Sequence, residues 1–233
     1  MEAWVKWARG PVFLFAFMFM LLGLIRHVVL TLFEMRRAMT QAGDKSIPLK
    51  KILIATLKWL FPMEAIKNRI VFSLTSIVFH FAILVVPIFL AGHIGLWTRG
   101  LGISWPAIPH DVADVLTLVG IISALTLVIE RAAARDTRAL SRIQDYVLPL
   151  IIAAPFASGF LVMHPSLNPF PYETTLFVHV MSANLVFVLI PLTKLTHAVL
   201  VPAVQLVSEI AWHWPPDAGT RVGETLGKAG EPI

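Results

Sequence analysis

Cysteine is absent from all 233 residues of the chain, and charged residues make up only 14% of them. The lack of thiols excludes disulfide bonds and any thiolate ligation of zinc or iron–sulfur clusters by this chain. The scarcity of charge, with 57% hydrophobic residues and a mean hydropathy of +0.78, excludes an ordinary soluble domain, whose surface needs more polar cover. The composition is that of a polytopic membrane protein.

What is present instead is a series of five apolar runs, each long enough to cross the bilayer as a helix of about 20 residues. They cover residues 12–33, 70–97, 112–129, 146–162 and 174–212. The first run is too long for the core of a signal peptide, so we expect an uncleaved helix. The last exceeds the thickness of a membrane, and its part after Pro202 should leave the bilayer. The expectation is an all-α bundle of five transmembrane helices in one domain, 1–212, with a polar tail over 213–233.

Basic residues are concentrated in alternate connections between these runs. Two connections hold most of them, namely Arg36, Arg37, Lys45, Lys50, Lys51, Lys58, Lys67 and Arg69 in the first and Arg131, Arg135, Arg138 and Arg142 in the third. The positive-inside rule then predicts an N-terminus outside and a C-terminus in the cytoplasm, in a bacterial or archaeal cytoplasmic membrane. Because the basic residues form no stripe with interleaved aromatics, they do not indicate nucleic-acid binding. The segment ILIATLKWLF, 52–61, is expected to form an interfacial helix.

Four histidines lie within the apolar runs, where an ionisable side chain is costly and usually has a function. His80 and His93 are on the second run, and His179 and His197 on the fifth. His179 and His197 are eighteen positions apart, which on a straight helix is about five turns and ~27 Å on one face. His80 and His93 are thirteen apart, and Pro87 between them is expected to kink the helix. Two histidines at each of two depths are what bis-histidine ligation of two haems requires, although membrane histidines often serve only as hydrogen-bonding residues.

The residues around these histidines carry a family resemblance. The fifth run, HVMSANLVFVLIPLTKLTHAVLVP, contains His179, Pro191, Thr193, Lys194, Leu195, His197 and Pro202, and the second run contains the pairs Phe79–His80 and Gly92–His93. This pattern resembles the gamma subunit of respiratory nitrate reductase and related membrane cytochromes, including those of heterodisulfide-reductase-like complexes. The second run departs from the family by three additional residues between its histidines.

The resemblance implies a membrane subunit with two haem b groups, one bound by His80 and His197 near the cytoplasm and one by His93 and His179 near the outer face. It further implies electron transfer between the quinone pool and an iron–sulfur subunit on the cytoplasmic face. The family's quinol site uses a lysine near the start of its third helix, and no equivalent lysine is present here. His110, with Asp111 or Asp114, and His164 are the candidate replacements, and the alternative is that they are ordinary interfacial polar residues.

Two other functions are compatible with the same histidines. A transporter or proton channel could use them to relay protons without a cofactor. A one-haem cytochrome or simple anchor would need only the helix of His179 and one partner histidine. His27 in the first run is a rival ligand should His93 fail, or else a packing residue. Lys194 and Arg69 could neutralise haem propionates, although a plain interfacial role is the simpler interpretation.

Overall fold

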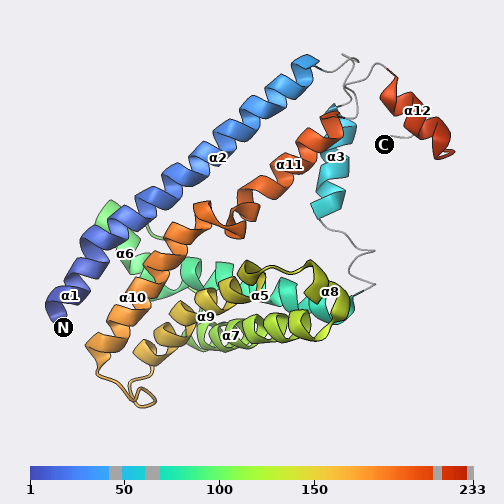
Figure 1. Cartoon of the computed structure of the whole chain (residues 1–233). Helices are drawn as coiled ribbons and strands as arrows, with labels where there is room; N and C mark the ends of the chain where they lie inside the picture. Colours follow the sequence, from blue (N-terminus) through green and yellow to red (C-terminus); the bar gives the residue numbers. More distant parts are fainter. Residues whose placement is uncertain (42–48, 61–68, 212–216, 230–233) are drawn as a thin grey trace. The chain divides into compact units, whose positions relative to one another are not determined.

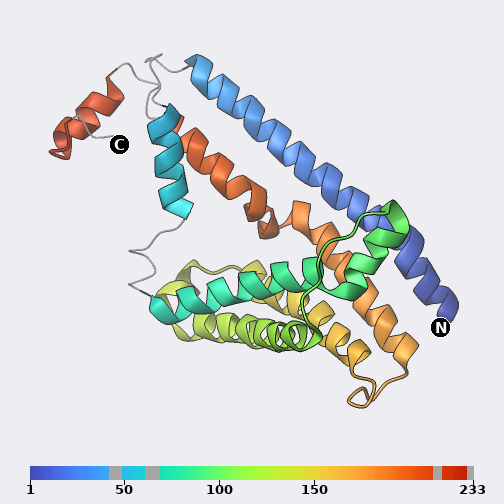
Figure 2. The ribbon, with the colours of Figure 1, turned by 180° about the vertical axis from the view of Figure 1, so that it is seen from behind.

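The computed structural model describes residues 1–41, 49–60, 69–211 and 217–229, and these residues form helices, turns and loops without a strand (Figures 1 and 2). The elements are α1 (Glu2–Trp7), η1 (Ala8–Val12), α2 (Phe13–Gln41), α3 (Leu49–Leu60), α5 (Ile70–Phe89), α6 (Ala91–Leu101), α7 (His110–Ala133), α8 (Arg135–Leu140), α9 (Ile143–Met163), α10 (Tyr172–Leu189), η2 (Ile190–Leu192), η3 (Lys194–Thr196), α11 (His197–Ala211) and α12 (Ala218–Thr225). Here η1 is a π-helical turn, whereas η2 and η3 are 3-10 turns. The predicted all-α class is confirmed.

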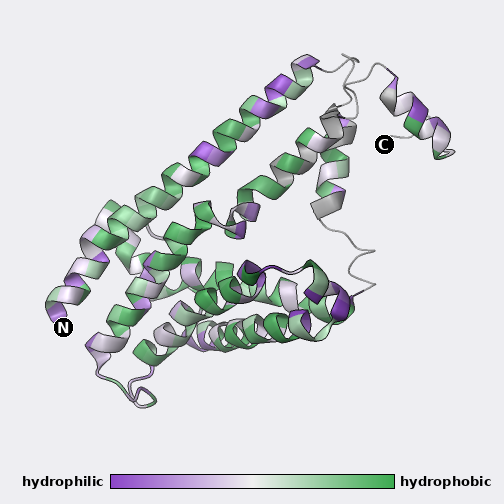
Figure 3. Ribbon diagram, in the orientation of Figure 1, coloured by the Kyte–Doolittle hydropathy of each residue, from purple (hydrophilic) through white to green (hydrophobic). Residues whose placement is uncertain are grey.

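Five helical stretches are long and apolar enough to cross a membrane, as the sequence predicts. They are Glu2–Gln41, Ile70–Phe89, His110–Ala133, Ile143–Met163 and Tyr172–Leu192. Figure 3 shows apolar residues along these helices and polar residues gathered near their ends. Large apolar side chains such as Leu22, Phe33 and Val71 are well exposed, which a lipid environment tolerates and water does not. The chain is a multi-pass membrane protein.

Three of the predicted runs differ from the observed helices in their bounds. The first helical stretch has 40 residues, about 60 Å of helix, and therefore extends well beyond the predicted 12–33. The second run, predicted as one helix over 70–97, is two helices that meet at Leu90, whose φ of −71° and ψ of 127° are extended. The fifth run is also broken, because η2, an extended Thr193 and η3 separate α10 from α11. The prediction that His179 and His197 lie on one face of a single straight helix is therefore wrong.

Contacts divide the chain into two units, residues 1–17 with 66–188 and residues 18–65 with 189–233, and each is described by itself. In the first unit, α5 packs against α7 and α7 against α9 (Figure 1). Small residues line the buried face of α7, and a Cβ on Gly120 would lie 3.1 Å from the Cβ of Ala82 on α5. Gly120 therefore allows the close approach of two backbones that is common between membrane helices.

The last turn of α5 keeps its carbonyl groups hydrogen-bonded through unusual partners. Trp105 Nε1 donates to the carbonyl of Ile88 at 2.9 Å, and the backbone N–H of Ile108 donates to that of Phe89 at 3.0 Å. The carbonyl of Pro87 accepts from the side chain of His93 at 3.0 Å. In lipid, a helix end without such partners is costly, so the fold-back of the 102–109 connection stabilises the break at Leu90.

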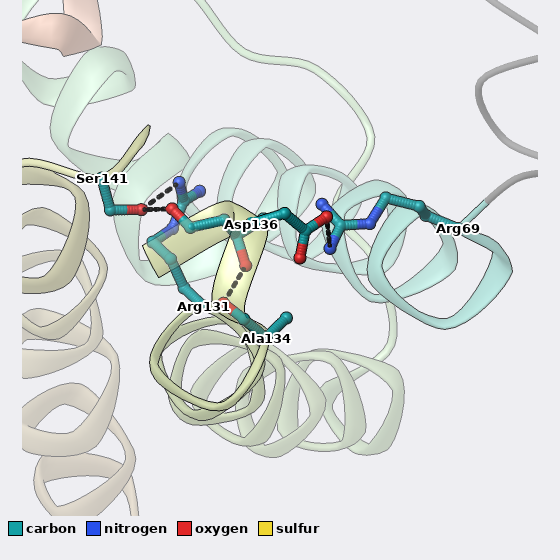
Figure 4. A network of polar contacts seen from close by, with 6 residues as sticks. Arg69, Arg131, Ala134, Asp136 and Ser141 are labelled. Atoms are coloured by element: carbon teal, nitrogen blue, oxygen red, sulfur yellow. Dashed lines mark hydrogen bonds and ion pairs between the residues drawn. The ribbon is translucent and has the colours of Figure 1, made fainter. Parts of the chain in front are cut away.

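The opposite end of this unit carries a polar network (Figure 4). Arg69 before α5 pairs with Asp136 on α8 at 3.0 Å, and Arg131 Nη1 at the end of α7 donates to Ser141 Oγ at 3.4 Å. Ser141 in turn donates to the carbonyl of Thr137 at 2.7 Å. These contacts connect α5 with the turn between α7 and α9. We call this the arginine end, and the opposite end, where α7 begins and α9 finishes, the histidine end.

In the second unit, α2 and the broken segment after α10 meet at Pro191. A Cβ on Gly23 would lie 2.4 Å from the Cβ of Pro191, and one turn further along α2, His27 Nε2 donates to the carbonyl of Pro191 at 2.9 Å. Gly23 therefore provides the space for this contact. The interfacial segment predicted over 52–61 falls within α3, which packs against α11, except for residue 61, which lies outside the described residues. The polar tail contains the short helix α12.

Some sequence-based expectations are not tested by this fold. Lys45 and Lys67 in the first basic connection lie outside the described residues. The prediction of a single domain over 1–212 stays a prediction.

Candidate functional site

The imidazoles of His93 on α6 and His179 on α10 lie near each other in the first unit. Their ring centroids are 6.1 Å apart, and the ring planes differ by only 9°. An imidazole centre lies about 1 Å behind its nitrogen and a metal–imidazole bond is about 2 Å long, so two imidazoles that share one metal ion have centres about 6 Å apart. The observed centroid distance agrees with that value, and it also lies within the range of offset-stacked rings.

Both rings are oriented by backbone carbonyl groups. His93 Nδ1 donates to the carbonyl of Pro87 at 3.0 Å, and His179 Nδ1 donates to that of Pro155 on α9 at 2.8 Å. Since a carbonyl can only accept, each Nδ1 carries a hydrogen, and each neutral ring presents a lone pair on Nε2. Within the described ranges, neither Nε2 makes a hydrogen bond. A carbonyl partner on the far nitrogen is the usual arrangement behind a metal-binding histidine.

Gly159 on α9 makes room for the ring of His179. A Cβ at this position would lie 2.9 Å from Cε1 and 3.0 Å from Nδ1 of His179. Pro155, whose carbonyl holds the ring, precedes Gly159 by one helical turn on the same helix. The sequence analysis missed both residues. The only signal was a glycine one turn after a proline in an apolar run, which is too common to be informative.

The second pair of predicted ligands shows the same local orientation. His80 Nδ1 donates to the carbonyl of Ser76 and His197 Nδ1 to that of Lys194, both at 2.7 Å. His80 belongs to the first unit and His197 to the second. Their pairing stays a prediction. His27 differs from all four, because it uses Nε2 for its hydrogen bond to the carbonyl of Pro191.

At the histidine end, three titratable side chains form a cluster. Asp114 Oδ2 lies 3.4 Å from His110 Nδ1, on its own helix, and 3.2 Å from His164 Nε2, at the end of α9. The structure therefore joins His110 and His164 through Asp114, one of the two carboxylates that the sequence left open. The other, Asp111, forms no ion pair with either histidine in the described part of the chain. Arg69, a candidate for a haem propionate, is paired with Asp136.

His93 and His179 are the residues that would hold a haem. In the described ranges no three His, Cys, Asp or Glu side chains are grouped so that they could hold a metal ion. A haem needs fewer protein ligands, because the porphyrin supplies four of iron's ligands and two imidazoles supply the rest. The near-parallel rings and the hydrogen-bonded Nδ1 atoms are compatible with that requirement.

A protein of Nitratidesulfovibrio vulgaris (strain Hildenborough) is 34% identical to this chain over 157 residues, which are 66% of this chain and 68% of that protein. This chain belongs to its family. The name of the relative states no activity. No family model and no solved structure matches the chain.

Proposed function

We propose that this chain is a two-haem b-type cytochrome subunit that transfers electrons between membrane quinones and an iron–sulfur partner on the cytoplasmic side. One observation carries the proposal, namely the near-parallel imidazoles of His93 and His179 at 6.1 Å, each with its Nδ1 held by a carbonyl. Ionisable side chains within membrane spans are costly and usually have a function, and here two of them lie close together with one ring nitrogen each already hydrogen-bonded.

The proposed topology follows from the charges at the two ends of the first unit. The arginine end carries Arg131, Arg135, Arg138 and Arg142, whereas the connection between α9 and α10 at the histidine end has no lysine or arginine. By the positive-inside rule the arginine end is cytoplasmic and the histidine end faces outward. His93 and His179 then hold the outer haem, and His80 with His197 the cytoplasmic one.

In this proposal the surrounding residues orient the rings of His93 and His179, exclude water from them and adjust their ability to bind a metal. The carbonyl groups of Pro87 and Pro155 set the ring orientation of His93 and His179 and make each Nε2 a better donor to a metal. Gly159 lets α9 lie against the ring of His179, which keeps water away from it. Bound haem supplies reversible one-electron chemistry that no side chain of this chain has.

The absence of cysteine bears on the choice of electron-transfer partner. Without cysteine the chain has no thiolate ligands for an iron–sulfur cluster, so the electrons must continue to another protein. On the resemblance to membrane cytochromes this is an iron–sulfur subunit at the cytoplasmic face.

The test is the haem content of the full-length chain, purified in detergent and measured as the pyridine haemochrome. The expected result is two haem b per chain in the wild type, one in His93→Gln and in His179→Gln, and two in the control His27→Gln. A colourless wild type would refute the proposal and favour a cofactor-free transporter. One haem in the wild type that is lost in His93→Gln and in His179→Gln but kept in His27→Gln would instead support the one-haem anchor.

A further inference from the structure

The cluster of His110, Asp114 and His164 has a graded exposure that leads from the protein to its surface. The side chains of Asp114 and His164 are each 27% exposed and that of His110 is 53% exposed. Both histidines approach the same carboxylate oxygen, Oδ2, at 3.4 and 3.2 Å. The second oxygen, Oδ1, makes no hydrogen bond or ion pair with the described residues.

The hydrogen bonds of His164 limit where a proton can lie in the cluster. His164 Nδ1 donates to the carbonyl of Phe160 at 2.9 Å, and its ring lies against that of Phe160 with centroids 4.2 Å apart. A neutral His164 therefore has only a lone pair on Nε2 to present to Asp114. His164 Nε2 and Asp114 Oδ2, 3.2 Å apart, form a hydrogen bond only when a proton lies between them, either on Nε2 or on the carboxyl group.

The two histidines differ in what they can do with that proton. His164 cannot pass it onward, because its Nδ1 is committed to Phe160, so it stores charge beside Asp114. His110, whose side chain is 53% exposed, can pass it onward, because a proton taken up at Nδ1 from Asp114 can be matched by one released from Nε2. The cluster thus has an open acceptor at Asp114 Oδ1 and an exit at His110.

The cluster and the His93–His179 pair are both linked to the last turn of α5. The backbone N–H of Ile108, two residues before His110, donates to the carbonyl of Phe89 at 3.0 Å, and His93 Nδ1 donates to that of Pro87 at 3.0 Å. The proton-accepting cluster therefore lies at the same end of the first unit as the proposed outer haem ligands.

We propose that Asp114 is the proton acceptor for quinol oxidation and that His110 delivers the protons to the outer face. This inference rests on the proposed function. Oxidation of one quinol breaks two O–H bonds and yields one quinone, two electrons and two protons. Bound haem would accept the two electrons through its one-electron chemistry, and both protons leave in turn through Asp114 and His110 to water, with His164 beside the carboxylate between transfers.

The test uses the full-length chain in detergent and menadiol as the reductant. Asp114→Asn keeps the shape of the side chain but cannot take up a proton, and Asp111→Asn is the matched control, since it removes the same charge from the same first turns of α7. A positioned proton acceptor contributes about 100-fold or more to a rate. The expected result is that menadiol reduces the haems about 100-fold more slowly in Asp114→Asn and at the wild-type rate in Asp111→Asn, while dithionite reduces both fully.

A second measurement does not depend on turnover. The infrared difference spectrum between menadione-bound and menadione-free protein should contain a carboxyl band that is lost in Asp114→Asn and kept in Asp111→Asn. If Asp114→Asn loses haem, His110→Gln becomes the deciding variant, with slow menadiol oxidation as the expected result. Wild-type menadiol rates in a haem-replete Asp114→Asn or His110→Gln protein would overturn the relay and leave the proposed function standing. A wild-type chain without haem would overturn the proposed function, and the infrared measurement would still report on Asp114.

Discussion

Replacement of Gly159 by alanine places a methyl group against the imidazole of His179. The new Cβ would lie 2.9 Å from Cε1 and 3.0 Å from Nδ1, so either the ring or α9 must move. Overpacking of this kind costs about 1–3 kcal/mol. Movement of the ring also weakens its bond to the carbonyl of Pro155, worth about 0.5–1.5 kcal/mol. Alanine contributes about 1 kcal/mol of stabilisation through its higher helix propensity, so the net cost is about 0.5–3.5 kcal/mol.

This cost falls on the ring orientation that the proposed outer haem requires. Because 1.4 kcal/mol is a factor of ten in affinity, we expect Gly159→Ala to bind haem at His93 and His179 about tenfold more weakly or worse. The assay is haem retention during gel filtration, followed as the pyridine haemochrome and as the reduced-minus-oxidised spectrum.

The control is Gly100→Ala on α6, where a Cβ would meet nothing within 4 Å and only the helix propensity changes. A Gly159→Ala protein that retains both haems as tightly as the wild type would refute the argument that this glycine makes room for the ring.

Three further predictions concern the other histidines and the arginine end. His27→Gln should lower the free energy of unfolding by about 1 kcal/mol, because a hydrogen bond to the carbonyl of Pro191 is lost, and should leave the haem content unchanged in the same haemochrome assay. His80→Gln and His197→Gln should each remove one haem and spare the other, and a double variant that still holds two would contradict that assignment. Asp136→Asn should change the melting temperature very little, since the ion pair it breaks is largely exposed, and a large shift on calorimetry would show that this contact stabilises more than such pairs normally do.

The number and position of the membrane helices could be predicted because they depend on one-dimensional information. An apolar run either reaches the length that the bilayer requires or does not, and the backbone in lipid has no alternative to helical hydrogen bonding. The places where these helices break could not be predicted. Pro87 and Pro191 are visible in the sequence, but the extended residues are Leu90 and Thr193, three and two positions later.

The reason lies in the partners of the freed carbonyl groups. A helix can end where its last carbonyls find other donors. For α5 these donors are the Trp105 side chain, the Ile108 backbone and the His93 ring, all beyond the break. Whether these donors reach the carbonyl groups at the end of α5 depends on the path of the 102–109 connection, which no local sequence pattern predicts.

The residues of the candidate site also divide into those that the sequence identifies and those that only the tertiary structure identifies. The sequence alone determined which side chains have the chemistry, since histidines and aspartates in apolar runs are rare and costly enough to be noticed one by one. Only the tertiary structure decided that Asp114 rather than Asp111 joins His110 to His164, and that Gly159 and the Pro155 carbonyl hold the ring of His179. Those contacts connect different helices, and their geometry depends on the packing of α9 against its neighbours, whereas the type and depth of each side chain are properties of the chain itself.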